Sequence, residues 1–210
     1  MSNYSTKSFK LENVFNSDEI TLLKKGLDKL PNTITTWSEN LVNYSYLNAF
    51  DKNHFVYPLI KKVVINKLED KLKKKIQVSQ GFYWKTRNAA IIHTDYGKTF
   101  GDEKNPSGNY LIPFTEGNTH TIVFNEECTD SFEEYIQQNK ELENNATHLF
   151  NDYCTHETYE RLKYVSLLNI YKWDIGSVIH WDRKLLHCSD NFLNNGLLEK
   201  SALLLFTNND

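Results

Sequence analysis

The chain has 210 residues, enough for one domain with a substantial core or at most two small ones. Aromatic residues make up 13% of the sequence, which argues against global disorder. The formal net charge of −3 gives no general electrostatic reason to expect nucleic-acid binding. No apolar run approaches the ~18 residues of a membrane-spanning helix, so membrane insertion is not expected.

Cysteine usage indicates a reducing compartment. Cys128, Cys154 and Cys188 are odd in number and show no CxxC spacing, and the N-terminus lacks the apolar core of a signal peptide. These features favour a cytoplasmic protein with three free thiols over a disulfide scaffold. They carry no indication of oligomeric state.

Two amphipathic helices are expected in the first third of the chain. Asn16 and Glu19 resemble a capping box at the start of a leucine-rich stripe, and Pro31 ends that helix. A second helix begins near Pro58, and its apolar positions recur every four residues at Ile60, Val64, Leu68 and Leu72. The lysines between them are typical of the solvated side of a helix that covers a sheet, rather than of a nucleic-acid site.

From Ile76 onward, apolar residues recur at every second position instead of every fourth, which predicts strands. One polar and helical insert, at Cys128–Ala146, interrupts them. The pattern indicates an all-β core, a sandwich or barrel, with helices packed outside. The strand candidates are Ile76–Arg87, Ala89–His93, Asn109–Phe114, Thr119–Asn125, Tyr164–Tyr171, Ser177–Trp181, Leu185–Cys188 and Ser201–Phe206.

The stretch from Trp173 to Thr207 organises the rest of the chain. It reads as three strands joined by tight turns, and Asn195-Gly196 predicts a two-residue hairpin. On this reading His187 and Lys200 lie on neighbouring strands, so one small ligand could touch both.

Two His-x-Asp motifs are present. The motif His93-Thr94-Asp95 closes an apolar run, and residues i and i+2 of a strand face the same way. His180-Trp181-Asp182 leaves no later strand for both a further ligand and a basic residue, so His180 is interpreted as a core or surface residue. With His187, the first motif gives two histidines and one carboxylate, the set that non-haem Fe(II) oxygenases use. Their ligating atoms should lie within about 4 Å of one another.

These residues resemble a known family. The HTD at 93–95, NYLIPF at 109–114, THTIVF at 119–124 and above all the pattern from 173 to 207 look like Fe(II)/2-oxoglutarate-dependent oxygenases of the prolyl-hydroxylase-like kind. The resemblance covers residues 76 to 207. It implies a mainly β chain with flanking helices: a double-stranded β-helix (jelly roll, cupin-like) preceded by two N-terminal helices. The expected organisation is one domain, 1–210, with a helical part at 1–75 and a jelly-roll core at 76–210.

The resemblance also implies roles for individual residues. His93, Asp95 and His187 match the iron ligands, and Lys200 matches the basic residue that binds the far carboxylate of 2-oxoglutarate. Arg is usual at that position, often with a hydroxyl residue two positions later, where this chain has Ala202. Tyr83 and Tyr110 resemble tyrosines that line the co-substrate pocket. The implied cofactor is Fe(II), with 2-oxoglutarate and O2 as co-substrates.

The implied activity is that of a dioxygenase that hydroxylates an amino acid, a protein side chain or another small molecule and releases succinate and CO2. Two alternatives stay open. One is a cupin-like metal-binding protein without oxygen chemistry, which would not need Lys200, and the other is a non-catalytic binding module. The loop 96–108 is a candidate lid or substrate-contact loop.

Overall fold

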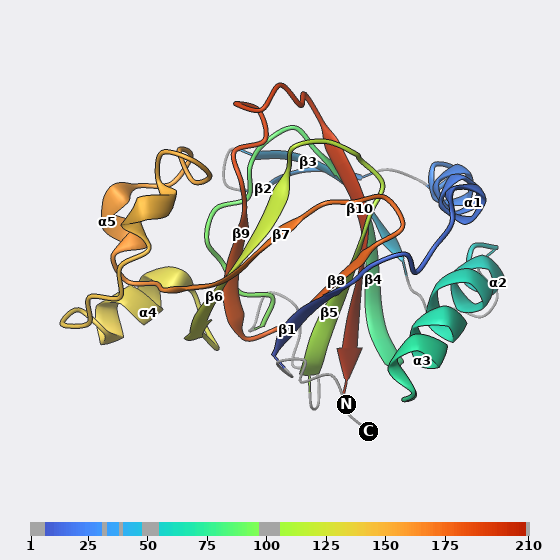
Figure 1. The fold of residues 1–210 in the computed structure, drawn as a ribbon, viewed down its shortest axis with the longest axis horizontal. Coiled ribbons are helices and arrows are strands. Elements are labelled where there is room, and N and C mark those ends of the chain that lie inside the picture. The colour runs from blue at the N-terminus through green and yellow to red at the C-terminus, as the bar shows by residue number, and fades with distance from the viewer. Residues whose placement is uncertain (1–6, 31–32, 38–39, 48–54, 97–105, 209–210) are drawn as a thin grey trace.

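Two antiparallel sheets and a small number of helices make up the protein (Figure 1). The computed structural model describes residues 7–30, 33–37, 40–47, 55–96 and 106–208, and the side chains of 33–47 and of residue 106 are not described. The prediction of a mainly β chain with flanking helices is confirmed. Within the described ranges, no helix has both the length and the apolar character needed to cross a membrane.

In chain order, the strands are β1 (Ser8–Leu11), β2 (Thr33–Trp37), β3 (Asn40–Leu47), β4 (Gln77–Thr86), β5 (Pro106–Pro113), β6 (His120–Glu127), β7 (Leu167–Lys172), β8 (Val178–Asp182), β9 (Leu185–Ser189) and β10 (Lys200–Asn208). The larger sheet has the order β1-β8-β5-β10-β4-β3-β2, and the smaller has the order β7-β6-β9. The first 75 residues therefore contribute three strands to the larger sheet as well as helices.

Helices cover the outer face of each sheet (Figure 1). α1 (Ser17–Leu27) begins at Asn16, which forms the predicted capping box with Glu19. α2 (Tyr57–Leu59), the π-helical turn η1 (Ile60–Ile65) and α3 (Asn66–Leu72) follow one another directly, and this run buries the predicted stripe at Ile60, Val64 and Leu68. On the other side, α4 (Phe132–Gln138), the 3₁₀ turn η3 (Thr147–Leu149) and α5 (Tyr159–Leu162) lie outside the smaller sheet.

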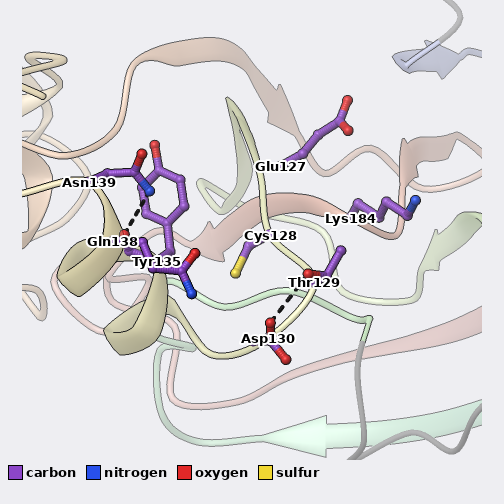
Figure 2. A pocket seen from close by; sticks show the side chains of 8 residues that line it. All are labelled: Glu127, Cys128, Thr129, Asp130, Tyr135, Gln138, Asn139 and Lys184. Carbon is purple, nitrogen blue, oxygen red and sulfur yellow. Dashed lines mark hydrogen bonds between the residues drawn. The ribbon is translucent and has the colours of Figure 1, made fainter.

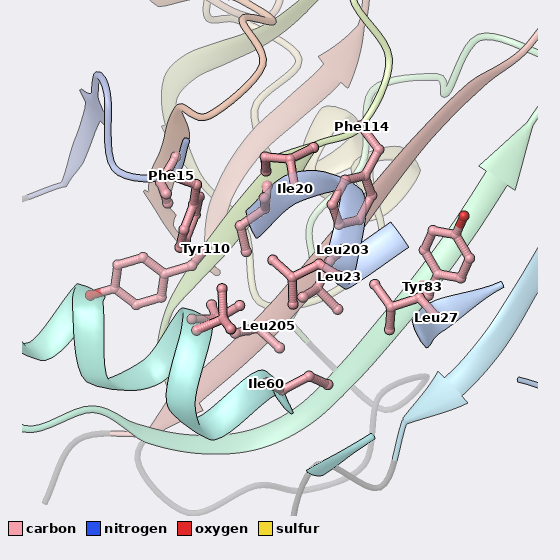
Figure 3. Close-up of a cluster of buried hydrophobic side chains, with 14 of the residues drawn as sticks. Phe15, Ile20, Leu23, Leu27, Ile60, Tyr83, Tyr110, Phe114, Leu203 and Leu205 are labelled. Atoms are coloured by element: carbon pink, nitrogen blue, oxygen red, sulfur yellow. The ribbon is translucent and has the colours of Figure 1, made fainter. Parts of the chain in front are cut away.

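Side-chain alternation along β10 separates an outer core from an interior. Leu203 and Leu205 pack against α1, α2 and the π-helical turn in the cluster that Figure 3 shows. Ala202 faces the other way, into a cluster between the two sheets that includes Val123 of the smaller sheet. Because side chains alternate with a period of two, Lys200 belongs to the interior face with Ala202.

The predicted hairpin at Asn195-Gly196 is wrong. β9 lies in the smaller sheet and β10 in the larger one, so the loop between them crosses from sheet to sheet. Consecutive backbone hydrogen bonds in this loop, such as Asn195 N–H to Phe192 O at 3.1 Å, form a coil of turns instead. Gly196 has a φ of +83°, while Asn195 is not among the residues with positive φ, so a type I′ turn is excluded.

The predicted strand Ala89–His93 is also wrong. Only His93 makes a β-bridge, with His187, and the residues before it have no strand conformation. On the side away from β9, the side chains of Glu157 and Arg161, rather than a neighbouring strand, bind the backbone N–H and C=O of Ile92. Ala90 faces β9, where its C=O accepts from Ser189 N–H at 3.2 Å and also from His156 Nε2. The proposed lid at 96–108 lies mostly outside the described residues.

Candidate metal centre

The single β-bridge joins two segments that are far apart in the sequence. His93 N–H donates to His187 O at 3.0 Å, and His187 N–H donates to His93 O at 2.9 Å. The imidazole ring centroids consequently lie 4.3 Å apart. Backbone pairing between the His-x-Asp segment and β9 is therefore what brings the two histidines together.

Asp95 completes a compact group with these histidines. Its Oδ2 lies 3.1 Å from His187 Nε2, and its Oδ1 lies 3.7 Å from His93 Nε2. One ligand atom from each residue lies within 4.8 Å of the others, and among the described residues no other group of three His, Cys, Asp or Glu side chains does so. The distances among these ligand atoms extend slightly beyond the predicted 4 Å, but the predicted convergence of the three side chains is observed.

Backbone carbonyls fix the orientation of both imidazoles. His93 Nδ1 lies 2.7 Å from Ile91 O and His187 Nδ1 lies 2.9 Å from Leu185 O, so each Nδ1 carries the proton and donates it. Each Nε2 then lies near an Asp95 carboxylate oxygen, at 3.7 Å for His93 and 3.1 Å for His187. Burial, and then the neighbouring His187, lower the pKa of His93 to about 4, which favours the neutral form that binds metals.

Asp95 is buried and held by polar groups on both its side chain and its backbone. Asn109 Nδ2 donates to Asp95 Oδ2, and Arg183 donates to the backbone oxygen of Asp95 through Nε at 3.1 Å and Nη2 at 2.9 Å. Burial alone raises the pKa of Asp95, but His187, His93 and Arg183 together bring it below its usual value. The carboxylate is therefore ionised and oriented at neutral pH.

The donor set fits Fe(II). Two imidazole nitrogens and one carboxylate oxygen are the donor set of facial non-haem iron sites. Two buried polar atoms near the triad, Asn109 Oδ1 and Trp181 Nε1, have no hydrogen-bond partner among the described residues. The Trp181 ring lies 4.9 Å from that of His187. Orphaned polar atoms beside a donor set are typical of a site that binds a further ligand.

Lys200 is buried in the interior face of β10, only 1% exposed. Its Nζ lies 4.5 Å from the Trp173 ring centroid and 4.7 Å from that of Phe192. Nothing in the sequence indicates that the rings of Trp173 and Phe192 lie beside Lys200. Burial lowers the pKa of Lys200 to about 8, against the opposing effects of Asp190 and Cys188.

Tyr83 and Tyr110 do not lie with the triad, and their predicted place in a co-substrate pocket is corrected. Both side chains belong to the core between the larger sheet and the helices (Figure 3). Tyr83 donates from its hydroxyl to Asp28 Oδ1 at 2.6 Å, and the Tyr110 ring packs 4.6 Å from that of His180. Strand alternation is the reason: these residues occupy the positions of β4 and β5 that face outward. His180 is a buried core residue, as predicted.

Several residues near the site were not identified from the sequence. In the sequence, Asn109 is only the first residue of a predicted strand, and nothing there indicates that Arg183 holds Asp95. Asp190 and Thr119 were not singled out, although Thr119 donates to Asp190 Oδ1 at 2.8 Å and accepts a long, 3.5 Å hydrogen bond from Lys200. The alternation of apolar and polar residues along a strand does not reveal these four residues, because it does not show which face of the strand points inward.

A surface hollow lies apart from these residues, beside α4 (Figure 2). It has a volume of about 320 Å³. Its lining includes Cys128, Tyr135 and Lys184, and none of the predicted site residues. The candidate metal centre is therefore distinct from this hollow.

Solved structures share the fold. A 2OG-Fe(II) oxygenase-family oxidoreductase from Burkholderia pseudomallei superposes with a TM-score of 0.60 at 8% identity, covering 97% of this chain and 86% of that one. HygX from Streptomyces hygroscopicus, solved with nickel and 2-oxoglutarate bound, gives 0.57 at 10% identity over 97% and 83%. A Pseudomonas putida prolyl-4-hydroxylase gives 0.53 at 8% identity over 98% and 94%.

No protein-family model and no curated protein sequence matches this chain. The likeness is therefore one of fold. The two sheets and their flanking helices are consistent with the double-stranded β-helix of 2-oxoglutarate oxygenases, and the resemblance stated from the motifs is confirmed at that level.

Proposed function

We propose that this protein is an Fe(II)- and 2-oxoglutarate-dependent dioxygenase that hydroxylates an amino acid, a protein side chain or another small molecule. The observation that carries the proposal is the convergence of His93, Asp95 and His187 inside a fold shared with 2-oxoglutarate oxygenases. A cupin-like protein without oxygen chemistry would also keep the triad, but it would have no need for a buried lysine at position 200.

In this proposal each residue of the triad has a distinct task. His93 and His187 hold iron through Nε2, since their Nδ1 atoms are engaged by backbone carbonyls. Asp95 supplies the anionic ligand, and Asn109 and Arg183 hold it in place. Iron with bound 2-oxoglutarate and O2 supplies the oxidising chemistry, which releases succinate and CO2.

Lys200 binds the far carboxylate of 2-oxoglutarate. An ammonium has three donors, yet among the described residues Lys200 Nζ makes one hydrogen bond, the long one to Thr119, and no carboxylate lies within 4.0 Å. A buried cation without a counterion is unfavourable, so an anionic ligand is stabilised there. Lys200 and the triad come from different sheets, and a dicarboxylate bound at the metal would bridge the interior between them.

The proposal is tested by succinate formation. Wild-type protein loaded anaerobically with Fe(II) should convert 2-oxoglutarate to succinate when O2 is admitted. Asp95→Ala removes the only anionic ligand of the triad and should reduce the rate to that of the protein-free mixture. A matched control is Asp130→Ala, which removes an exposed carboxylate of the surface hollow and should leave the rate unchanged. Equal rates in wild type and Asp95→Ala would place the chemistry elsewhere.

A further inference from the structure

The backbone just before His93 is held by side chains on the side away from β9. On the β9 side, Ala90 N–H donates to Ser189 Oγ at 2.8 Å. On the opposite side, the Glu157 carboxylate accepts the N–H of Ile92, and Arg161 Nη2 donates to Ile92 O at 3.2 Å. One acid–base pair from the segment between β6 and β7 therefore satisfies both backbone polar groups of the residue next to His93.

Glu157 is buried and Arg161 is partly buried, and the pair has further partners. Glu157 is 6% exposed, and its Oε2 lies 3.0 Å from Arg161 Nε. The guanidinium of Arg161 also reaches Glu133 of α4 at 2.7 Å and lies 4.8 Å from the Phe132 ring centroid. Because the charges compensate each other and have several partners, the pair is a rigid support rather than a loose surface contact.

The hydrogen bonds to the backbone of Ile92 influence the orientation of the His93 imidazole through one peptide group. The N–H of Ile92 and the C=O of Ile91 belong to the same planar peptide unit. Glu157 binds the N–H end of that unit, and His93 Nδ1 donates to its C=O end at 2.7 Å. Holding the peptide plane therefore holds the imidazole and leaves Nε2 as the free nitrogen.

We propose that Glu157 and Arg161 are positioning residues that couple the segment around α5 to the metal centre by fixing this peptide plane. The claim about metal binding rests on the proposed function of the triad. The effect on the orientation of the His93 imidazole is expected in the protein before any metal or co-substrate is bound. Neither residue touches the metal ligands directly, so their effect passes through the backbone.

The test compares Glu157→Ala with Glu157→Gln. Alanine removes the acceptor for Ile92 N–H, whereas the glutamine oxygen still accepts that hydrogen bond. Binding of Co(II), measured anaerobically by calorimetry, should weaken about 10- to 100-fold in Glu157→Ala, as is typical when outer partners of a ligand are lost. Glu157→Gln should recover most of that loss.

Arg161→Lys and Lys163→Met form a matched pair of changes around α5. Lysine keeps the charge at position 161 but lacks the fork that reaches Ile92 O, Glu157 and Glu133 together, so Co(II) affinity should fall at least tenfold. Among the described residues, the Lys163 ammonium pairs with the exposed Glu160 and lies 5.8 Å from the Tyr159 ring centroid, so its replacement should leave Co(II) affinity unchanged.

The decisive readout is the ¹⁵N-histidine NMR spectrum of the metal-free protein, with His93 assigned by substitution. We expect a single Nδ1–H tautomer for His93 in wild type and Glu157→Gln, and a mixture of tautomers in folded Glu157→Ala. An unchanged His93 signal in Glu157→Ala overturns the proposal, as does equal loss of Co(II) affinity in Ala, Gln and the Lys163 control. Since these spectra need neither metal nor 2-oxoglutarate, they decide this proposal even if the oxygenase function fails.

Discussion

In the function that we propose, Lys200 is the residue that distinguishes an oxygenase from a simple metal-binding protein. Its ammonium lies between two aromatic rings, and burial lowers its pKa to about 8. The triad could bind a metal without this lysine, but a dicarboxylate co-substrate needs a cation at its far end. The properties of Lys200 should therefore appear in 2-oxoglutarate binding and not in metal binding.

The affinity for 2-oxoglutarate should decrease above about pH 8. Both carboxylates of 2-oxoglutarate are already ionised there, whereas Lys200 loses its proton as the pH passes its pKa. If only the ammonium form binds the co-substrate, the dissociation constant should rise about tenfold per pH unit beyond that point. The measurement is anaerobic calorimetry of 2-oxoglutarate with Ni(II) in place of Fe(II).

Two variants control this pH experiment. Lys200→Arg stays charged, so the affinity should be nearly independent of pH between about pH 7 and pH 9. Lys200→Ala should weaken binding about tenfold or more below about pH 8, where the wild-type lysine is charged, and the difference from wild type should shrink above that pH, while Ni(II) affinity is kept. A decrease of the same size in Lys200→Arg would assign the titration to another group.

At the scale of single residues, the sequence predicted the donor atoms better than their surroundings. The His-x-Asp spacing and the late histidine identified the three side chains that converge, since one backbone bridge is enough to join their segments. Tyr83 and Tyr110 were misplaced because each lies on the outward face of its strand, and a single sequence does not reveal which face is inward.

At the scale of elements, the regular helices and most strands were predictable from period and capping, as α1 illustrates. The errors occurred where long-range pairing decides the structure. Asn195-Gly196 has the residues of a hairpin turn, but the chain crosses between sheets there. Ala89–His93 has the apolar pattern of a strand, but Glu157 and Arg161 replace the partner strand.

Gly176 connects the N-terminal segment to the turn before β8. Its carbonyl accepts hydrogen bonds from Val14 N at 2.8 Å and Phe15 N at 3.0 Å. Its φ is +83°, and a Cβ on this residue would lie 2.3 Å from Phe15 O. Any side chain at this position would therefore combine an unfavourable backbone conformation with a clash against backbone.

Gly176→Ala should destabilise the protein by about 3 kcal/mol or more, because a strained φ alone costs of the order of 1–3 kcal/mol. Gly196→Ala is the matched control: it has the same φ of +83°, but no atom lies within 4 Å of the added Cβ. It should cost only about 1 kcal/mol. Urea unfolding at equilibrium measures both; equal losses would show that the contact with Phe15 is unimportant.

At the scale of the whole molecule, the two sheets enclose an interior that carries every residue assigned to the reaction. β9 and the His-x-Asp segment contribute the triad, and β10 of the opposite sheet contributes Lys200. The same arrangement of sheets occurs in solved 2-oxoglutarate oxygenases over nearly the whole chain. The function we propose requires metal and co-substrate to meet in this interior.

Anaerobic titration of 2-oxoglutarate into the protein with and without Fe(II) tests this requirement most directly. We predict that one equivalent of 2-oxoglutarate binds to the iron-loaded protein, and that the affinity falls at least tenfold when iron is omitted, since the metal and Lys200 bind opposite ends of the molecule. Iron-loaded wild-type protein that binds no 2-oxoglutarate would contradict the account and leave a metal-binding β-protein without oxygenase function.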